Sequence, residues 1–405
     1  MSLDGDSRNI VVIGAGYGGI TAALRLANLF RSSPGYRIVL VDRYPFHTLK
    51  TQLHEAAVHK SEVTIDIGRI IRDRNISFRL ASVASIDLVD RHIGFAATSI
   101  PFDYLVLALG SQANFYNITG LEKHGFPLQS AADAGKIYEH ITALCAGAST
   151  EADPLRRRAM LRFVVGGGGL SGIELAAELV DHAAQSVRNY RLSLDEAEVI
   201  VVEGAEDILP ASEAGMRERT RKKLESKGVR ILTGTRVVGV SSEEIELSTG
   251  ERLQSRTLVW TGGIRISEIA QQSGFAIGQS GRIIVNEFLQ SVTSPRVYAI
   301  GDNALAINPA TGKPVPAAAQ FALQQGRLVA ENLHSAVVGR ALRPYRPKVW
   351  GEVVSLGRHL AVGWVALPIL KKLQFVGFLA SLLKTAIKEK HIILLRKESR
   401  NWIVY

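Results

Sequence analysis

The stretch that decides the fold is residues 163–179, FVVGGGGLSGIELAAEL. An apolar run typical of a strand enters four consecutive glycines and continues as a helix with a glutamate near its start. A second stretch of this kind, IVVIGAGYGGI, occupies residues 10–20. A strand, a glycine turn and a helix in this order are typical of the pyrophosphate-binding turn of a dinucleotide-binding domain. The chain is therefore predicted to contain two such domains.

Each turn has the three glycines that the fingerprint needs for a tight turn, close approach of a pyrophosphate and helix–strand packing. They are Gly14, Gly16 and Gly19 in the first turn and Gly167, Gly169 and Gly172 in the second. Asp42 and Glu203 end the next strands and are expected to bind a ribose. They follow the first glycine by 28 and 36 positions, and longer helices and loops explain a spacing above the usual ~20. Two ordinary glycine-rich turns are the alternative.

The order of elements around the two turns also repeats. A meander and another apolar strand follow each acidic residue, over residues 82–100 and 104–111 in the first half and 245–253 and 258–263 in the second. A further apolar strand at 296–302 and a helical stretch at 317–333 come later. We predict a duplicated α/β unit whose first copy is discontinuous. The expected ranges are 1–120 with 280–340, then 121–279, then a tail over 341–405.

Charge and cysteine content exclude several classes of protein. The net charge is +10, and residues 341–405 alone hold 12 Lys and Arg against 3 Asp and Glu. A basic tail on a nearly neutral body disfavours a nucleic-acid binder. Cys145 is the only cysteine, which excludes a disulfide framework, a redox cysteine pair and a cysteine metal site within one chain. We expect Cys145 to be buried in a helix, and no metal site.

Two dinucleotide sites suggest a hydride donor and an acceptor, and NAD(P)H with FAD is the common pair. Gly204 and Ala205, not a cation, follow Glu203. An acidic ribose partner repels a 2′-phosphate, so NADH is favoured over NADPH. The start of the chain does not read as a signal peptide, and no uncharged apolar run reaches the ~18 residues of a membrane span. The protein is expected to be made in the cytosol.

The motifs together resemble those of two-dinucleotide flavoproteins of the pyridine nucleotide-disulfide oxidoreductase-like superfamily, and within it the type II NADH dehydrogenases (NADH:quinone oxidoreductases). The resemblance runs from about Asn9 to the C-terminus, and its specificity lies in the order of the motifs. They are GAGYGG (14–19), DRYPFHTLKTQLHEAA (42–57), DYLVLALGS (103–111), NITGLEKHGFPLQSAADA (117–134), AIGDNA (299–304), AAQFALQQG (318–326) and VVSLGRHLAVG (353–363). Leu109 departs from the pattern, which usually has Thr there.

The resemblance implies FAD in the first unit, NADH in the second, and electron transfer to a membrane quinone without proton pumping. It implies further cofactor contacts at Ala108, Gly110, Gly262, Gly301, Asp302 and Ala319. It also places Gln320, Gln324 and Gln325 beside the flavin, although the last two alternatively form an exposed helix face. Glu174 is implied at the nicotinamide and on the proton path to quinone; the alternative is a first-turn carboxylate that favours the helix dipole. His47, His54 and Glu55 are interpreted as structural or flavin-side residues.

The tail has its own pattern. Apolar residues at helical spacing over 374–390, with lysines mostly away from them, predict an amphipathic helix in the interface of an anionic membrane. The protein is then peripheral, on the cytoplasmic face of the cell membrane, and the resemblance lets Lys384 reach the flavin. A helix packed on the body, or a homodimer contact, is the alternative. Two other functions stay open: a soluble reductase of a protein electron carrier, and an NADH-binding redox sensor.

Overall fold

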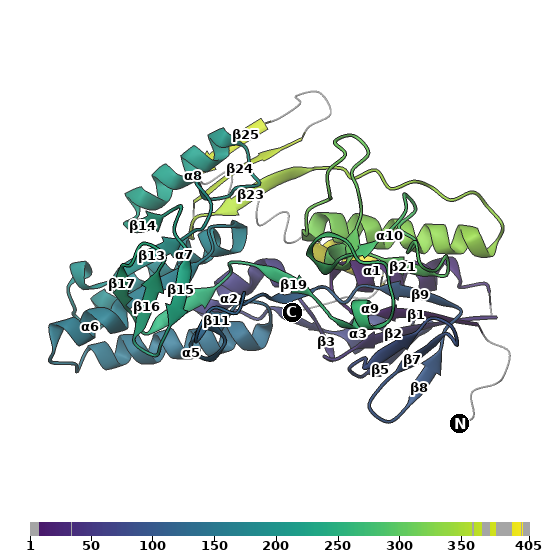
Figure 1. The fold of residues 1–405 in the computed structure, drawn as a ribbon, viewed down its shortest axis with the longest axis horizontal. Helices are drawn as coiled ribbons and strands as arrows, with labels where there is room; N and C mark the ends of the chain where they lie inside the picture. Colours follow the sequence, from purple (N-terminus) through teal and green to yellow (C-terminus); the bar gives the residue numbers. More distant parts are fainter. Residues whose placement is uncertain are drawn as a thin grey trace.

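The chain folds into two α/β units that repeat one sheet design (Figure 1). The computed structural model describes residues 8–33, 35–358, 360–366, 373–377, 391–397 and 399. Within these residues each unit is built on a parallel sheet of five strands. The predicted pair of Rossmann-like units is confirmed.

The first sheet has the strand order β21-β9-β1-β2-β5. Its strands are β1 (Arg8–Ile13), β2 (Tyr36–Asp42), β5 (Ile76–Leu80), β9 (Tyr104–Leu107) and β21 (Val297–Ala299). The last four residues of the central strand β1 form a continuous apolar run because their side chains are buried on both faces of the sheet. Strand β21 follows the whole second unit in sequence, yet it pairs in parallel with β9. The first unit is therefore discontinuous, as predicted.

The second sheet has the equivalent order, β11-β18-β12-β13-β14. Its strands are β11 (Phe126–Pro127), β12 (Arg162–Gly166), β13 (Glu198–Val202), β14 (Val229–Leu232) and β18 (Thr257–Trp260). Each unit also has the predicted antiparallel meander. The meanders are β6 (Ser85–Asp87), β7 (His92–Gly94) and β8 (Ser99–Pro101), and β15 (Val237–Val240), β16 (Glu244–Leu247) and β17 (Arg252–Gln254).

Two long helices of the first unit, α1 (Tyr17–Leu29) and α10 (Ala319–Val337), lie side by side along its sheet (Figure 1). Glycines allow them to approach: a Cβ added at Gly326 would lie 2.3 Å from the Gly18 carbonyl oxygen. Helix α10 begins with the AQFALQQG segment. The packing therefore fixes that segment against the first glycine turn.

Contacts between the units come from a few elements. Helix α2 (Leu53–His59) of the first unit contacts α5 (Ala131–Ala148) and α7 (Leu170–Asn189) of the second. Strand β10 (Ser111–Ala113) pairs with β19 (Ile264–Ile266). Cys145 is buried in α5, as expected. Helix α2 of the first unit thus packs directly against α5 and α7 of the second.

The smaller elements complete the two units. They are β3 (Phe46–Thr48), η1 (Lys50–Gln52), β4 (Thr64–Asp66), α3 (Ile67–Ile71), α4 (Leu121–His124), α6 (Pro154–Leu161), η2 (Leu194–Glu196), α8 (Ala214–Ser226), α9 (Ile269–Gln272), η3 (Gln279–Gly281), β20 (Ile283–Ile284), η4 (Gly301–Asn303) and β22 (Ala304–Leu305).

The tail differs from the prediction in part. Residues 373–377, expected at the start of the amphipathic helix, form the strand β25 (Leu373–Gly377). It completes an antiparallel sheet with β23 (Gly351–Ser355) and β24 (Ala361–Val365) beside α7 and α8 (Figure 1). The helix is therefore wrong over 374–377, because the backbone there pairs with β24. Residues 378–390, with Lys384, lie outside the described part of the chain.

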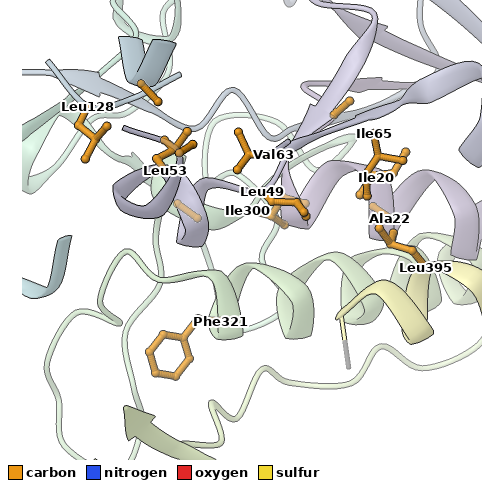
Figure 2. Close-up of a cluster of buried hydrophobic side chains, with 14 of the residues drawn as sticks. Ile20, Ala22, Leu49, Leu53, Val63, Ile65, Leu128, Ile300, Phe321 and Leu395 are labelled. Carbon is orange, nitrogen blue, oxygen red and sulfur yellow. The ribbon is translucent and has the colours of Figure 1, made fainter. Parts of the chain in front are cut away.

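The last described segment, residues 391–397, is helical and packs on the first unit. Ile392 and Leu395 are buried in the main core. Figure 2 shows Leu395 pointing toward the part of α1 that holds Ile20 and Ala22. This end of the tail therefore packs on the body of the protein.

Candidate active site

The first glycine turn has the shape of a pyrophosphate cradle. At Gly14 (φ +98°) a Cβ would lie 2.2 Å from the Ala108 carbonyl oxygen, and at Gly19 it would lie 1.7 Å from the Gly14 carbonyl oxygen. These two glycines are required by the fold itself. A Cβ at Gly16, which caps α1, would meet nothing within 4 Å. That open space lies at the start of the helix, where free N–H groups favour a phosphate.

The second turn repeats this geometry. A Cβ at Gly167 (φ +116°) would lie 2.7 Å from Gly262 Cα, and one at Gly172 would lie 1.9 Å from the Gly167 carbonyl oxygen. A Cβ at Gly169, the residue that caps α7, would again meet nothing within 4 Å. Both turns therefore fit a dinucleotide. In each turn the outer two glycines are needed for backbone packing, and only the middle glycine has open space beside it for a ligand.

The two acidic residues are held in the same way. Asp42 accepts hydrogen bonds from the N–H groups of Ala15 at 2.6 Å and Tyr44 at 2.8 Å. Glu203 accepts from Gly168 at 2.5 Å and from Ala205 at 2.7 Å. A carboxylate oxygen has more than one lone pair, so each side chain can still accept from ribose hydroxyls. The backbone thus fixes both carboxylates beside their cradles.

One residue near Glu203 was missed by sequence reasoning. A Cβ at Gly204 would lie 3.2 Å from Cγ of Arg236, so the arginine stem lies over the residue that follows Glu203. The two are far apart in sequence, so no local motif reports them. An arginine near the acidic ribose partner can accommodate the 2′-phosphate of NADP, so Arg236 makes the comparison of NADH with NADPH informative.

Gly301 and Asp302 are tied to α10. The Gly301 N–H donates to Oε1 of Gln325 at 2.6 Å, and the Ser111 hydroxyl donates to Asp302 Oδ2 at 2.6 Å. Gln325 is 1% exposed, so the exposed-face alternative is wrong for this residue. Lys50 was also missed: its side chain is open to water, yet desolvation by the protein around it lowers the pKa of its ammonium, with Asp302 the main opposing charge.

The other two glutamines of α10 hold the segment that leads into β23. Gln324 Nε2 donates to the Lys348 carbonyl at 2.8 Å, and its Oε1 accepts from the Lys348 N–H at 2.9 Å. Gln320 Oε1 accepts from the Trp350 N–H at 3.3 Å. Ala319 begins the helix one residue earlier. The amides of Gln320 and Gln324 therefore fix the backbone of residues 348–350 beside the start of α10.

Glu174 lies where three elements meet. Its Oε1 accepts from the Ser355 N–H at the end of β23 at 3.0 Å, and its Oε2 lies 3.5 Å from Nδ1 of His54 on α2. The side chain of Glu174 is 12% exposed and that of His54 is 3% exposed. Strand β23 thus has Gln320 near its first residue and Glu174 at its last. The structure brings these two residues to one strand from opposite units.

A second carboxylate–imidazole pair lies one helical turn further along α7. Glu178 is buried, and its Oε2 lies 2.8 Å from Nε2 of His59. The hydrogen bond with Glu178 raises the pKa of His59; Glu55 also raises it, and burial and Arg358 lower it. The pair joins α2 of one unit to α7 of the other.

This pair predicts a pH dependence of stability. Protonated His59 is favoured in the folded state, so its contribution is complete below the unfolded pKa of about 6.5 and is lost as pH rises through the higher folded pKa. We expect His59→Gln to lower the free energy of unfolding by on the order of 1 kcal/mol below pH 6 and to have a smaller effect at pH 8. Urea unfolding at both pH values measures this. An equal loss at both would show that His59 acts only through packing.

His47 connects the first cradle to the tail. Its Nδ1 donates to the Ala15 carbonyl at 2.7 Å, and its Nε2 lies 3.1 Å from Nε2 of His391. Tyr17 packs on the His391 ring with 4.6 Å between the centroids. Burial lowers the pKa of His47 to about 4 and that of His391 to about 3, so both imidazoles are neutral.

In the described ranges, no three His, Cys, Asp or Glu side chains are grouped so as to hold a metal ion. Likewise, none of the helices that the structure describes combines the length and apolarity needed to cross a bilayer.

Comparison with known proteins gives relatives that match over most of the chain. The profile of the family described as pyridine nucleotide-disulphide oxidoreductase matches residues 8–326. The type II NADH:quinone oxidoreductase of Staphylococcus saprophyticus is 26% identical over 366 residues, which are 89% of this chain and 90% of that protein. The protein of the same name from Staphylococcus aureus is 28% identical over 368 residues, again 89% and 90%.

Solved structures share the fold. NDH2 from Plasmodium falciparum, in complex with NADH, superposes with a TM-score of 0.83 at 18% identity, covering 97% of this chain and 96% of that one. The sulfide:quinone oxidoreductase of Aquifex aeolicus superposes with a TM-score of 0.79 at 18% identity, covering 97% and 92%. The fold of nearly the whole chain therefore has counterparts among solved structures.

Proposed function

The matched profile covers most of the chain, so the chain belongs to the pyridine nucleotide-disulphide oxidoreductase family; on this premise we propose that it is an FAD-dependent NADH:quinone oxidoreductase of the type II kind. The curated relatives with that name support the proposal. The observation that carries it is the pair of equivalent cradles, each with an acidic ribose partner and an open space at its middle glycine.

The first cradle, with Asp42, would hold FAD, and the second, with Glu203, would hold NADH. When bound, FAD supplies the acceptor for the hydride of NADH and the donor of two electrons for a quinone. The role of the chain is to position the two cofactors. The turns would hold the diphosphates, and the residues that would border them are Ala108, Gly110, Gly262, Gly301 and Asp302. Because Cys145 is the only cysteine of the chain and is buried, the mechanism has no cysteine pair.

Quinone reduction also consumes a proton from solution, because NADH delivers only one hydrogen with its two electrons. Glu174 is the side chain that we assign to this proton. It is partly open to solvent, accepts from the backbone of β23 and lies beside the His54 imidazole. A carboxylate in this position can accept a proton and pass it on without moving its backbone. Gln320, at the other end of β23, would orient the quinone by hydrogen bonding.

We further propose that the enzyme is peripheral on the cytoplasmic face of the membrane and does not pump protons. Support comes from the basic tail and from large apolar side chains that the structure leaves exposed. They are Val349, Trp350, Leu373, Val376 and Ile393, between 39% and 55% exposed. Apolar side chains flanked by cations suit the interface of an anionic bilayer.

The proposal is tested by purifying the full chain and comparing electron acceptors. We expect flavin absorbance to copurify and NADH to reduce a short-chain quinone much faster than ferredoxin or oxygen. NADPH is expected to be the poorer donor because Glu203 repels its 2′-phosphate. A colourless protein, or faster reduction of ferredoxin than of quinone, would contradict the proposed function.

A further inference from the structure

A cavity of about 380 Å³ lies among α1, α10, the segment 343–350 and the helical residues 391–397. Its volume is in the range of small-molecule sites. Three elements give it an apolar floor, represented by Leu24, Leu323 and Leu395. None of the roles assigned above to FAD, NADH or Glu174 uses this cavity.

The rim of the cavity is strongly cationic. Arg327, Arg343, Arg346 and Lys348 line it, and among the described residues of the lining Glu331 is the only carboxylate. Glu331 is already paired with Arg25 and with Arg343. In the described part of the chain Arg346 and Lys348 have no acidic partner, and both side chains are exposed. The cavity therefore presents uncompensated positive charge above an apolar floor.

One wall of the cavity has a buried acceptor. His47 Nδ1 donates to a carbonyl, so its Nε2 is unprotonated and accepts from Nε2–H of His391. This leaves Nδ1 of neutral His391 as an acceptor, and within the described residues it has no hydrogen-bond partner. Leaving a buried acceptor unmet costs free energy.

The surroundings of the cavity are apolar and exposed. Trp350 lines it and is 42% exposed, the neighbouring Val349 is 46% exposed, and Ile393, two residues from His391, is 55% exposed. Exposed tryptophan and aliphatic side chains next to cations are typical of a surface in contact with lipid head groups.

From these observations, and on the basis of the proposed membrane-associated function, we propose that this cavity binds one anionic glycerophospholipid. Its phosphate would lie against Arg346 and Lys348 and its acyl chain over the leucine floor. Lipid recognition by this protein would then be stoichiometric and not only a general attraction between a basic tail and a charged surface. A quinone would fill the floor but would leave the rim cations uncompensated.

The test uses full-length, FAD-loaded protein and a short-chain lipid below its micelle concentration. Dihexanoyl-phosphatidylglycerol is titrated by calorimetry against dihexanoyl-phosphatidylcholine, which has the same chains without net charge. We expect one phosphatidylglycerol per chain, bound at least tenfold more tightly than phosphatidylcholine. The double variant Arg346→Gln with Lys348→Gln should bind phosphatidylglycerol at least tenfold more weakly. The control, Lys123→Gln with Lys136→Gln, removes the same charge from exposed sites on the second unit and should change this binding less than twofold.

Equal binding of the two lipids, an equal loss in the control variant, or displacement of phosphatidylglycerol by a soluble quinone would overturn the lipid site; the last result would assign the cavity to quinone. Unchanged flavin absorbance and unfolding midpoint show that each variant is folded. Wild-type NADH oxidation by a short-chain quinone is measured in parallel. Activity without lipid selectivity would refute only the lipid site, whereas absence of activity would refute the proposed function.

Discussion

Gly169→Val is expected to give a folded, yellow protein that NADH cannot reduce, and Gly16→Val a folded protein without flavin. In both turns the middle glycine has free space around its Cβ position and an extended φ near −70°, so a valine fits the fold. The valine would occupy the space that a pyrophosphate needs. Each substitution should lower the free energy of unfolding by no more than about 1 kcal/mol, while the altered cradle no longer binds its cofactor.

The matched control is Gly172→Val, on the same turn as Gly169. A Cβ there would lie 1.9 Å from a backbone oxygen, so this variant should lose stability and not only NADH. Flavin absorbance, anaerobic reduction by NADH and the unfolding midpoint distinguish loss of FAD in Gly16→Val, loss of NADH binding in Gly169→Val and loss of stability in Gly172→Val. If Gly16→Val retained FAD and Gly169→Val lost it, the assignment of the two cradles would be reversed.

Glu174→Gln is expected to keep FAD and its reduction by NADH but to slow reoxidation by quinone about 10²- to 10⁴-fold, the usual contribution of a positioned acid or base. Glutamine keeps the size of the side chain and its hydrogen bond to Ser355 but cannot carry the proton. Stopped-flow measurement of the two half-reactions tests this directly.

Glu178→Gln is the control for Glu174, because it makes the same substitution one turn later on α7. It breaks the pair with His59, so it should lower stability, but quinone reoxidation should stay near the wild-type rate. Similar slowing in both variants would indicate a general loss of contact between α2 and α7. An unchanged rate in Glu174→Gln would remove Glu174 from the proton path.

The two units could be predicted from sequence because their signals are local. A glycine turn between an apolar strand and a helix is decided within about 20 residues, and close backbone contacts at Gly14 and Gly167 leave no other residue type. The duplication followed from order alone. The pattern of residues 297–299 fits either unit, and their return to the first sheet was predicted from their position after the second unit.

The tail could be predicted less well because its pattern is ambiguous. Residues 373–377 contain apolar side chains that fit a helical stripe, but short apolar runs also form strands. These residues form a strand because their backbone pairs with β24, for example Gln374 with Trp364. That pairing depends on the position of β24 in the folded protein, which the local sequence does not report. The burial of Gln325 stayed undecided and Arg236 was missed for the same reason: their partners are distant in sequence.

The contact of His391 with His47 has a thermodynamic consequence. The Ala15 N–H donates to Asp42, and the Ala15 carbonyl accepts from His47, which contacts His391. Ala15 of the first cradle is therefore linked both to the carboxylate expected to bind the ribose and to the C-terminal helix. If flavin binding stiffens that residue, it strengthens docking of the helix, and docking must strengthen flavin binding by the same factor. Loss of the cofactor and release of the C-terminus are then one coupled equilibrium, so a chain that has lost its flavin would also present a different surface to its surroundings.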